Sequence, residues 1–278
     1  MPESFLSRLS GISYGLFVYG LGSLCLAFMI IPVLISLIMS FTSAQTLKFP
    51  PPGLSLHWYV ALFDPVQSEI IHQAAWNTLQ IAILAVLASL FFAVPAAFGM
   101  ARISARRANA LEPLFLAPIV LPSLVYGLAL LIAANLMHIS PSVWLVVLAN
   151  VVVFGPLMYR ATASIAAQLD ISLEDASSLL GASRWATFRR ITLPLLAPGI
   201  FAGMFLVFIQ SIENVSLALF LAPAGTQVLP LEMFAMLQDT LDPRIAAISG
   251  VLIAVAIIVL VAVQRLTPFL KSKRQTDP

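Results

Sequence analysis

The stretch EDASSLLGASRWATFRRITLPLLAPG, residues 174–199, determines how this sequence is interpreted. It is polar and charged, yet it lies between two apolar runs of a chain that is 60% hydrophobic and only 9% charged. So few charges cannot cover a water-soluble globule, because such a surface needs roughly a quarter of its residues charged. The composition therefore indicates a membrane protein that keeps one folded polar segment between two of its spans.

Six apolar runs have the length of about twenty residues that a helix needs to cross a bilayer. Long uninterrupted runs favour helices over the alternating strands of a membrane barrel. The first run is longer than the apolar part of a signal peptide, which has about 7–15 residues, so it is predicted to be a retained helix. The fold class is therefore expected to be an all-α membrane protein. The expected spans are 16–39, 78–100, 113–134, 142–159, 199–221 and 245–264.

The basic residues are divided unevenly between the two sets of loops. Twelve of the fourteen Lys and Arg residues lie on the side that holds both termini and the polar segment, and only Lys48 and Arg244 lie on the other side. Short loops rich in Lys and Arg remain in the cytoplasm. Both termini and the polar segment are therefore predicted to be cytoplasmic.

Residue types in the polar segment predict a helix, a turn and a second helix. Ser172 and Asp175 have the spacing of a capping box, and Gly181 suits a left-handed helix end. Ser183 is placed to cap the second helix. The prolines of "LPLLAPG" are expected to end that helix before the next span begins.

Apolar residues on this cytoplasmic segment predict a partner. Leu173, Ala176 and Leu180 share a face of the first helix, and Trp185 and Phe188 share a face of the second. A helix lying on lipid headgroups is the alternative. Such helices usually need neither a glycine break nor an acidic start, so docking on another protein is favoured.

The same residues resemble the EAA signature of ABC-importer permeases, in which a Glu-Ala-Ala start is followed by a Gly-Ala turn and a Leu-Pro end. Asp175 stands where the family usually has Ala. The stretches LSLHWYVALF, NTLQIAILAVLASL and VLPLEMFAMLQDTLDPRIAAIS resemble the spermidine/putrescine-type branch, so the resemblance covers most of residues 54–264. The matching positions of the signature are Glu174, Ala176, Gly181, Ala182, Phe188, Ile191, Leu193 and Pro194.

This resemblance implies the type I ABC importer permease (MetI-like) fold, with one peripheral helix and a five-helix core. It divides the chain into an N-terminal transmembrane helix with a periplasmic loop (1–76), the permease core (77–264) with a cytoplasmic coupling segment (170–198), and a basic cytoplasmic tail (265–278). It also implies that a separate ATP-binding subunit receives the first short helix. The implied coupling residues are Glu174, Asp175, Ala176, Leu180, Gly181, Ala182 and Arg184.

The fifth expected span contains a carboxylate deep in an apolar helix. Burying a lone charge near the bilayer centre costs about 2.5–3.5 kcal/mol on insertion scales, so such a residue faces a cavity or a partner. Offsets of 0, 3, 4 and 7 place its polar residues on one helical stripe with Leu217. The stripe lines the translocation pathway or forms a hydrogen-bonded cluster between helices. The candidate pathway residues are Gln210, Glu213, Asn214, Tyr126 and Asn150.

Motifs for chemistry within this chain are missing from the sequence. It has no G-x-x-x-x-G-K-[ST] phosphate loop and no G-x-S-x-G nucleophile elbow, and its three His residues have no metal-ligand spacing. The chain is therefore not expected to be an enzyme or to hold a cofactor. ATP and Mg²⁺ are expected to bind to a partner ATPase.

The expected function is that of the permease subunit of a bacterial ABC importer in the inner membrane, forming half of the pathway for a small polar solute. Polyamine-type relatives tend to carry two acids where this chain has Glu213 and Asn214, so an opine, an amino-acid-like compound or an organophosphonate competes with a polyamine. The expected partners are a second homologous permease, two ATP-binding subunits and a periplasmic solute-binding protein in the lipid bilayer; nucleic acid is not expected.

Two other functions compete with this interpretation. An ion-gradient-driven transporter would have intramembrane ion ligands, inverted repeats or broken helices, and only Glu213 favours it. A non-transporting membrane assembly factor would need no polar stripe. The ion-gradient alternative also leaves the polar segment 172–194 unexplained.

Overall fold

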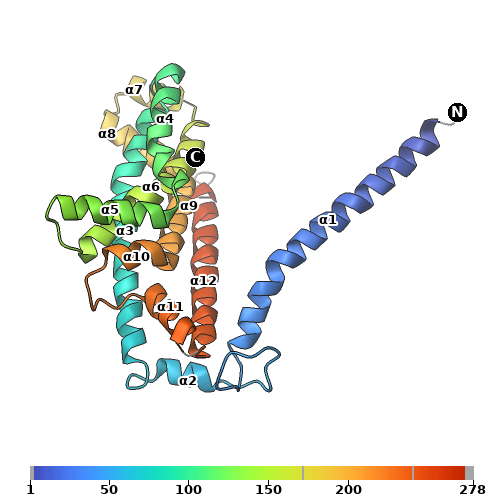
Figure 1. Ribbon diagram of the computed structural model, residues 1–278. Coiled ribbons are helices and arrows are strands. Elements are labelled where there is room, and N and C mark those ends of the chain that lie inside the picture. Colours follow the sequence, from blue (N-terminus) through green and yellow to red (C-terminus); the bar gives the residue numbers. More distant parts are fainter. Residues whose placement is uncertain (1–2, 171, 240, 273–278) are drawn as a thin grey trace. The chain divides into compact units, whose positions relative to one another are not determined.

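The computed structural model describes residues 3–170, 172–239 and 241–272, and it describes side chains from Phe17 to Arg265 within those ranges. Over these residues the chain is helical apart from short connections and one bridge between Thr42 and Leu54 (Figure 1). The all-α prediction is therefore confirmed. Two basic residues of the predicted tail, Lys273 and Arg274, lie outside the described residues.

The helices follow one another with short connections, apart from the long loop 40–56 between the first two. Their bounds are α1 (Glu3–Met39), α2 (His57–Phe63), α3 (Glu69–Met100), α4 (Ala105–Val120), α5 (Ser123–Leu136), α6 (Val143–Ala166), α7 (Ser172–Leu179), α8 (Arg184–Thr187), the π-helical turn η1 (Phe188–Thr192), α9 (Leu193–Glu213), α10 (Val215–Leu221), α11 (Leu229–Asp239) and α12 (Arg244–Ser272).

Five helical segments of the described chain are long and apolar enough to cross a membrane, and a bent helix pair raises the number to six. The first, second, fourth and sixth expected spans fall on α1, α3, α6 and α12. The other two expected spans are not single helices.

The third expected span, 113–134, is broken. α4 ends at Val120 and α5 begins at Ser123, with a bend of 96° between them. Leu121 is extended (φ −78°, ψ 136°) because the residue before a proline is disfavoured in the helical region, and Pro122 takes the N-cap of α5. The expectation of a single helix over residues 113–134 is therefore wrong.

The fifth expected span, 199–221, is broken at Asn214. This residue leaves the helical conformation (φ −78°, ψ 99°), and its Oδ1 accepts a hydrogen bond of 2.7 Å from the N–H of Leu217. An Asn side chain that satisfies a free N–H in this way begins a new helix, here α10. The prediction of one continuous helical stripe through residues 210, 213, 214 and 217 is therefore wrong.

The chain forms two compact units. One contains residues up to Gln67 together with Met236–Ile253, and the other contains Ser68–Ala235 together with the residues from Ala254 onward. In the first unit the Tyr59 hydroxyl donates to Ser40 Oγ at 2.8 Å, and Trp58 Nε1 donates to the carbonyl of Ala44 at 3.1 Å. These bonds attach α2 to the end of α1 and to the loop that follows it.

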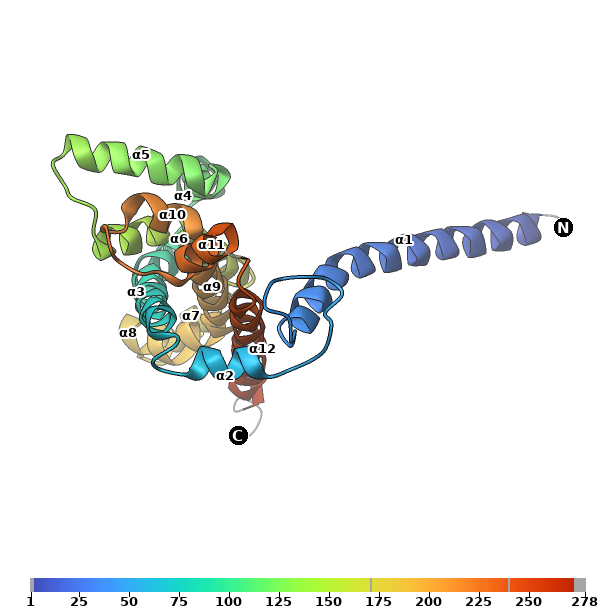
Figure 2. The ribbon, with the colours of Figure 1, turned by 60° about the horizontal axis from the view of Figure 1, so that its bottom comes forward.

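The second unit has its core where α3, α6 and α9 pack together; these three helices run side by side in both views (Figures 1 and 2). Met158, Leu196 and Val207 are fully buried there. Gly199 of α9 lets two backbones approach, because a Cβ at this position would lie 2.6 Å from the carbonyl oxygen of Ala161 in α6. The sites described below lie along this packed group of helices.

Candidate functional site

The polar segment folds as the predicted helix, turn and second helix. Gly181 ends the α7 region with φ +82°, and Ser183 Oγ accepts the N–H of Ala186 at 3.3 Å where α8 begins. Asp170, however, supplies the first cap, because its Oδ1 accepts the N–H of Ser172 at 2.9 Å. The prediction that Ser172 is the N-cap of a capping box is therefore wrong. Hydrogen bonds from Ser172 lower the pKa of the Asp170 carboxyl.

The second helix does not end at the prolines, which is a further correction. A π-helical turn, η1, joins α8 to α9, and the N–H of Leu193 donates to the carbonyl of Phe188. Pro194 lies at the start of α9, directly after the π-helical turn, and Pro198 lies inside the helix. The helical path therefore runs from Arg184 to Glu213 without a stop.

Glu174 in α7 is held from two sides. Its carboxylate accepts a short hydrogen bond within an ion pair from Arg102, and Oε1 also accepts the Thr192 hydroxyl at 2.5 Å. Burial opposes the charge on Glu174, but the bonds from Arg102 and Thr192 outweigh it and lower the pKa of the carboxyl. Glu174 is therefore ionised at neutral pH and joins α7 to the end of α3 and to η1.

Arg102, just beyond the C-terminus of α3, is fixed by its own surroundings. Its guanidinium lies 3.3 Å from the centroid of the Phe98 ring, and Nη1 donates to the Phe98 carbonyl at 3.2 Å. The Phe98 ring also meets Phe188 edge-on at 5.3 Å, and Phe188 stacks on Trp185 at 5.8 Å. The predicted pairing of Trp185 with Phe188 is confirmed, and it continues into α3.

A cavity of about 560 Å³ lies beside the Arg102–Glu174 contact. It brings together four of the predicted coupling residues, Glu174, Asp175, Ala182 and Arg184. The Ser177 and Thr187 hydroxyls form a buried hydrogen bond of 2.9 Å that holds α7 against α8. The remaining lining residues are Phe98, Arg102, Ser178, Trp185, Thr187, Phe188 and Thr192.

The segment also exposes apolar side chains, one of which, Trp185, lines the cavity as well. Leu179 and Leu180 are 88% and 89% exposed, and Trp185 is 70% exposed. Leu173 and the predicted coupling residue Ala176 are also exposed, and Gly181 lies in the turn beside them. This surface, Leu173, Ala176, Leu179, Leu180 and Trp185, is called the apolar edge below; Leu179 was not among the predicted residues.

The predicted pathway residues lie on three helices and at the break between α9 and α10. Gln210 and Glu213 are exposed on α9, and neither side chain is hydrogen-bonded to another described residue. Asn214 is the cap described above. Tyr126 is half-buried on α5, which packs against α10. Asn150 on α6 is only 2% exposed; its Nδ2 donates to the Val146 carbonyl at 2.9 Å, and its Oδ1 has no partner in the described part of the chain.

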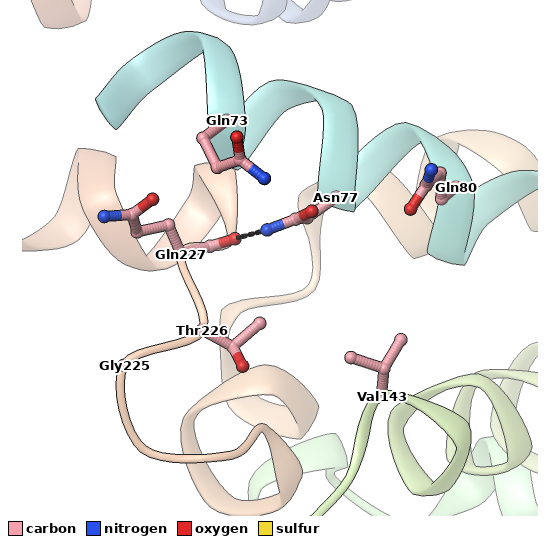
Figure 3. A pocket seen from close by; sticks show the side chains of 7 residues that line it. All are labelled: Gln73, Asn77, Gln80, Val143, Gly225, Thr226 and Gln227. Atoms are coloured by element: carbon pink, nitrogen blue, oxygen red, sulfur yellow. Dashed lines mark hydrogen bonds between the residues drawn. The ribbon is translucent and has the colours of Figure 1, made fainter. Parts of the chain in front are cut away.

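A second polar cavity, of about 380 Å³, lies near the N-terminal end of α3 and was not predicted. Gln73 and Asn77 point from α3 toward the loop before α11, where Asn77 Nδ2 donates to the carbonyl of Gln227 at 2.8 Å (Figure 3). The sequence does contain a pattern that could have predicted this site: the amides Gln73, Asn77 and Gln80 have offsets of 0, 4 and 7, which place them on one face of an apolar span. This cavity, called the amide pocket below, is lined by Gln73, Asn77, Gln80, Val143, Gly225, Thr226 and Gln227.

Metal binding has no support in the structure, because the described residues contain no group of three or more His, Cys, Asp or Glu side chains suited to an ion. The two sites offer non-covalent interactions: binding of a ligand and contacts between helices.

Comparison with known proteins gives a consistent result. The model of the family described as "Binding-protein-dependent transport system inner membrane component" matches residues 89–270. The putative 2-aminoethylphosphonate transport system permease protein PhnV of Salmonella choleraesuis is 26% identical over 256 residues, covering 90% of this chain and 93% of that protein. The spermidine/putrescine transport system permease protein PotC of Escherichia coli is 24% identical over 238 residues, covering 86% and 89%.

Solved structures share the fold. The crystal structure of a bacterial ABC transporter involved in the import of the acidic polysaccharide alginate has a TM-score of 0.69 at 16% identity, covering 98% of this chain and 99% of that one. An inward-facing structure of the MetNI methionine ABC transporter has a TM-score of 0.60 at 13% identity, covering 74% and 98%. The predicted permease fold is therefore confirmed.

Proposed function

This chain belongs to the inner membrane components of binding-protein-dependent transport systems, and on that premise we propose that it is the permease subunit of a bacterial ABC importer. Family membership makes it a multi-pass inner-membrane protein of a transport system, not an enzyme. In the proposed complex it pairs with a second homologous permease, two ATP-binding subunits and a periplasmic solute-binding protein. ATP and Mg²⁺ bind to the partner ATPases.

The Arg102–Glu174 contact is the observation that carries the mechanism. The coupling segment 170–198 docks on an ATPase through the apolar edge, because exposed leucines and a tryptophan on a cytoplasmic helix gain most by burial against protein. Glu174 is bonded to Arg102 and Thr192. A displacement of α7 by the ATPase is therefore passed to α3 and α9.

α3 and α9 both pack against α6, so the displacement acts on a close-packed group of helices. Such interiors transmit strain instead of absorbing it. Alternating access then follows when ATP binding draws two coupling segments of the dimer together. In this scheme Asp175, Ala182 and Arg184 shape the cavity behind α7, while Ala176, Leu180 and Gly181 belong to the docking side and its turn.

The pathway is assigned to the break between α9 and α10. A helix that ends at Glu213 leaves that carboxylate and Gln210 exposed, which a membrane tolerates only beside water, solute or another subunit. Asn214, Tyr126 and Asn150 complete the proposed lining. Each permease contributes half of the pathway.

The proposed solute is a small polar compound: a polyamine, an opine or other amino-acid-like compound, or an organophosphonate. Both curated relatives above are named for transport of amine-bearing compounds, which supports this class. The proposed division of the chain is a peripheral helix and periplasmic loop (1–76), a core (77–264) and a basic cytoplasmic tail (265–278), with both termini in the cytoplasm.

Co-purification tests the docking. Leu180→Glu is expected to lower the amount of ATPase that co-purifies with the permease by at least about tenfold, because burying one leucine contributes about 1.5–3 kcal/mol. Val66→Glu is the matched control, since Val66 is also highly exposed (87%) but lies outside the coupling segment. Undiminished ATPase retention by Leu180→Glu, with normal solute uptake, would remove the basis of the proposed function.

A further inference from the structure

The amide pocket is explained neither by coupling nor by the predicted pathway residues. It lies in the same compact unit as the Arg102–Glu174 contact, near the other end of α3. None of its seven lining residues is ionisable, and four of them carry a side-chain amide (Figure 3). A cavity of this composition has hydrogen-bonding capacity without charge.

The framework of the pocket is held by two hydrogen bonds. Asn77 Nδ2 donates to the carbonyl of Gln227, and the N–H of Leu229 donates to the buried Thr78 Oγ1 at 2.8 Å. These bonds join α3 to the loop that carries Gly225 and Thr226 and to the start of α11, which follows that loop. The pocket is therefore formed before any ligand enters, as is usual for small-molecule sites.

The inward-facing groups remain available. The side chains of Gln73, Gln80 and Thr226 make no hydrogen bond to another described residue, and Asn77 uses only its amide nitrogen. An amide offers two donors and an acceptor with two lone pairs, and a hydroxyl offers both functions. One small cavity thus presents donors and acceptors side by side.

We propose that the amide pocket binds a small zwitterionic solute that carries an ammonium and an acid group. This inference rests on the proposed function and narrows its solute class. Amide oxygens accept from the ammonium while amide N–H groups donate to the acid, so one lining serves both ends of the ligand. A solute with a net charge would lose its hydration without meeting an opposite charge among the lining residues.

Size supports a small molecule as the occupant. The volume of about 380 Å³ lies at the lower end of the range of about 300–1,000 Å³ for ligand pockets. Glu69, one helical turn before Gln73, is not among the lining residues. The position on α3 makes the pocket a place where solute is held before it reaches the break at Asn214.

Thiol protection tests the proposal. Cys25 is the chain's only cysteine, so Gln80→Cys in a Cys25→Ser background gives one reporter in the pocket. The permease–ATPase complex, in lipid nanodiscs without binding protein, is labelled at neutral pH with N-ethylmaleimide alone or with about 10 mM L-glutamine, 2-aminoethanesulfonate, putrescine or succinate at constant ionic strength. We expect the first two probes to slow labelling at least about threefold and the last two to leave it unchanged.

Two variants complete the test. Trp76→Cys, 57% exposed on α3 but not among the lining residues of the pocket, is the matched control and should show no protection by any probe. Adding Gln73→Leu to Gln80→Cys should abolish the protection, and Gln73→Asn should retain part of it. Labelling needs neither ATP nor coupled movement, so a complex that shows protection but fails to transport would contradict the proposed function alone.

Three results would overturn the inference. If putrescine protects as well as L-glutamine, a nearby carboxylate, that of Glu69, and not the uncharged lining would determine which solute binds. Absence of protection by both zwitterions would leave the pocket without its ligand class. Slower labelling only after addition of the binding protein would make it a protein-docking surface.

Discussion

α3 has two different sites near its two ends. Beyond its C-terminus, Arg102 forms an ion pair with Glu174 and lies on the ring of Phe98. The Phe98 ring in turn contacts an aromatic ring of the coupling segment. Near its N-terminus, Gln73 and Gln80 face a loop with their amides unpaired among the described residues. A site that passes on movement is built from tight, mutually satisfied contacts, whereas a site that exchanges ligands keeps its hydrogen-bonding groups free.

The separation of the two sites fits a membrane protein. A helix from Asn77 to Phe98 spans about 32 Å at about 1.5 Å per residue, close to the hydrocarbon thickness of about 30 Å. α3 therefore reaches from one side of the bilayer to the other with a site near each surface. Variants at one end should leave the other end intact, and each prediction below depends on that separation.

The largest effect is expected from Gly181→Val. A β-branched residue at φ +82° is strained by about 1–3 kcal/mol, which reorients α7 and should lower ATPase retention at least about fivefold and abolish coupled uptake. The abundance of the permease in membranes should stay normal. Membrane abundance, ATPase co-purification and uptake by proteoliposomes are measured together.

Gly225→Val is the matched control for Gly181→Val. Gly225 has the same φ of +82° and equally open space around a Cβ, but it lines the amide pocket. We expect normal ATPase retention with this variant. If both variants lose the ATPase to the same extent, the two ends of α3 are not separate sites.

An intermediate effect is expected from Glu213→Leu. Membrane insertion should be unimpaired, because the change removes a desolvation cost, whereas uptake should fall about tenfold through loss of the one carboxylate in the proposed lining. ATPase retention should not change, since Glu213 is remote in sequence from the coupling segment. Wild-type uptake by Glu213→Leu would make Glu213 a packing residue.

Gly199→Ala tests the packing that connects the two ends. The added Cβ would meet the carbonyl oxygen of Ala161 at 2.6 Å, so overpacking should cost about 1–3 kcal/mol and lower the thermal stability of the complex. Gly99→Ala is the control, because a Cβ there meets nothing within 4 Å. Equal melting temperatures for the two variants would argue against close packing of α6 and α9.

The smallest effect is expected from pH. A carboxyl whose pKa is lowered on folding contributes stability above its ordinary pKa and loses it only as pH falls through the lowered value, so the Glu174 contact should persist between about pH 5 and 8. ATPase retention should be flat over this range in wild type. A drop at the acidic end that Glu174→Gln does not show would mean that Glu174 titrates there.

Local signals made the coupling segment predictable. Gly181, Ser183 and the Trp185–Phe188 pair each depend on neighbours within a few residues, and all three were placed correctly. The error at Ser172 has the same local origin, because the side chain of Asp170, two residues earlier, accepts the N–H of Ser172 in place of Asp175. The prediction that the prolines end the second helix was wrong because η1, with its π-helical hydrogen bonds, continues the helix into α9.

Contacts distant in sequence were not predictable in this way. Arg102 and Glu174 are 72 residues apart, so periodicity and spacing do not reveal their pairing. Asn214 is polar at a helical spacing, and only its side-chain bond to Leu217 shows that it ends one helix and begins another. Only the α3 side of the amide pocket could have been predicted, because its three amides have helical spacing. The loop residues that complete the pocket follow about 150 positions later in the sequence.

Charge exchange between Arg102 and Glu174 tests the central claim most directly. Uptake per ATP hydrolysed is measured in proteoliposomes for Arg102→Glu, Glu174→Arg and the double variant. Each single variant places like charges together and should lower this ratio at least about tenfold, while the double variant restores the ion pair and should recover to within about threefold of wild type. Single variants that couple normally, or a double variant no better than the singles, would contradict transmission through this contact.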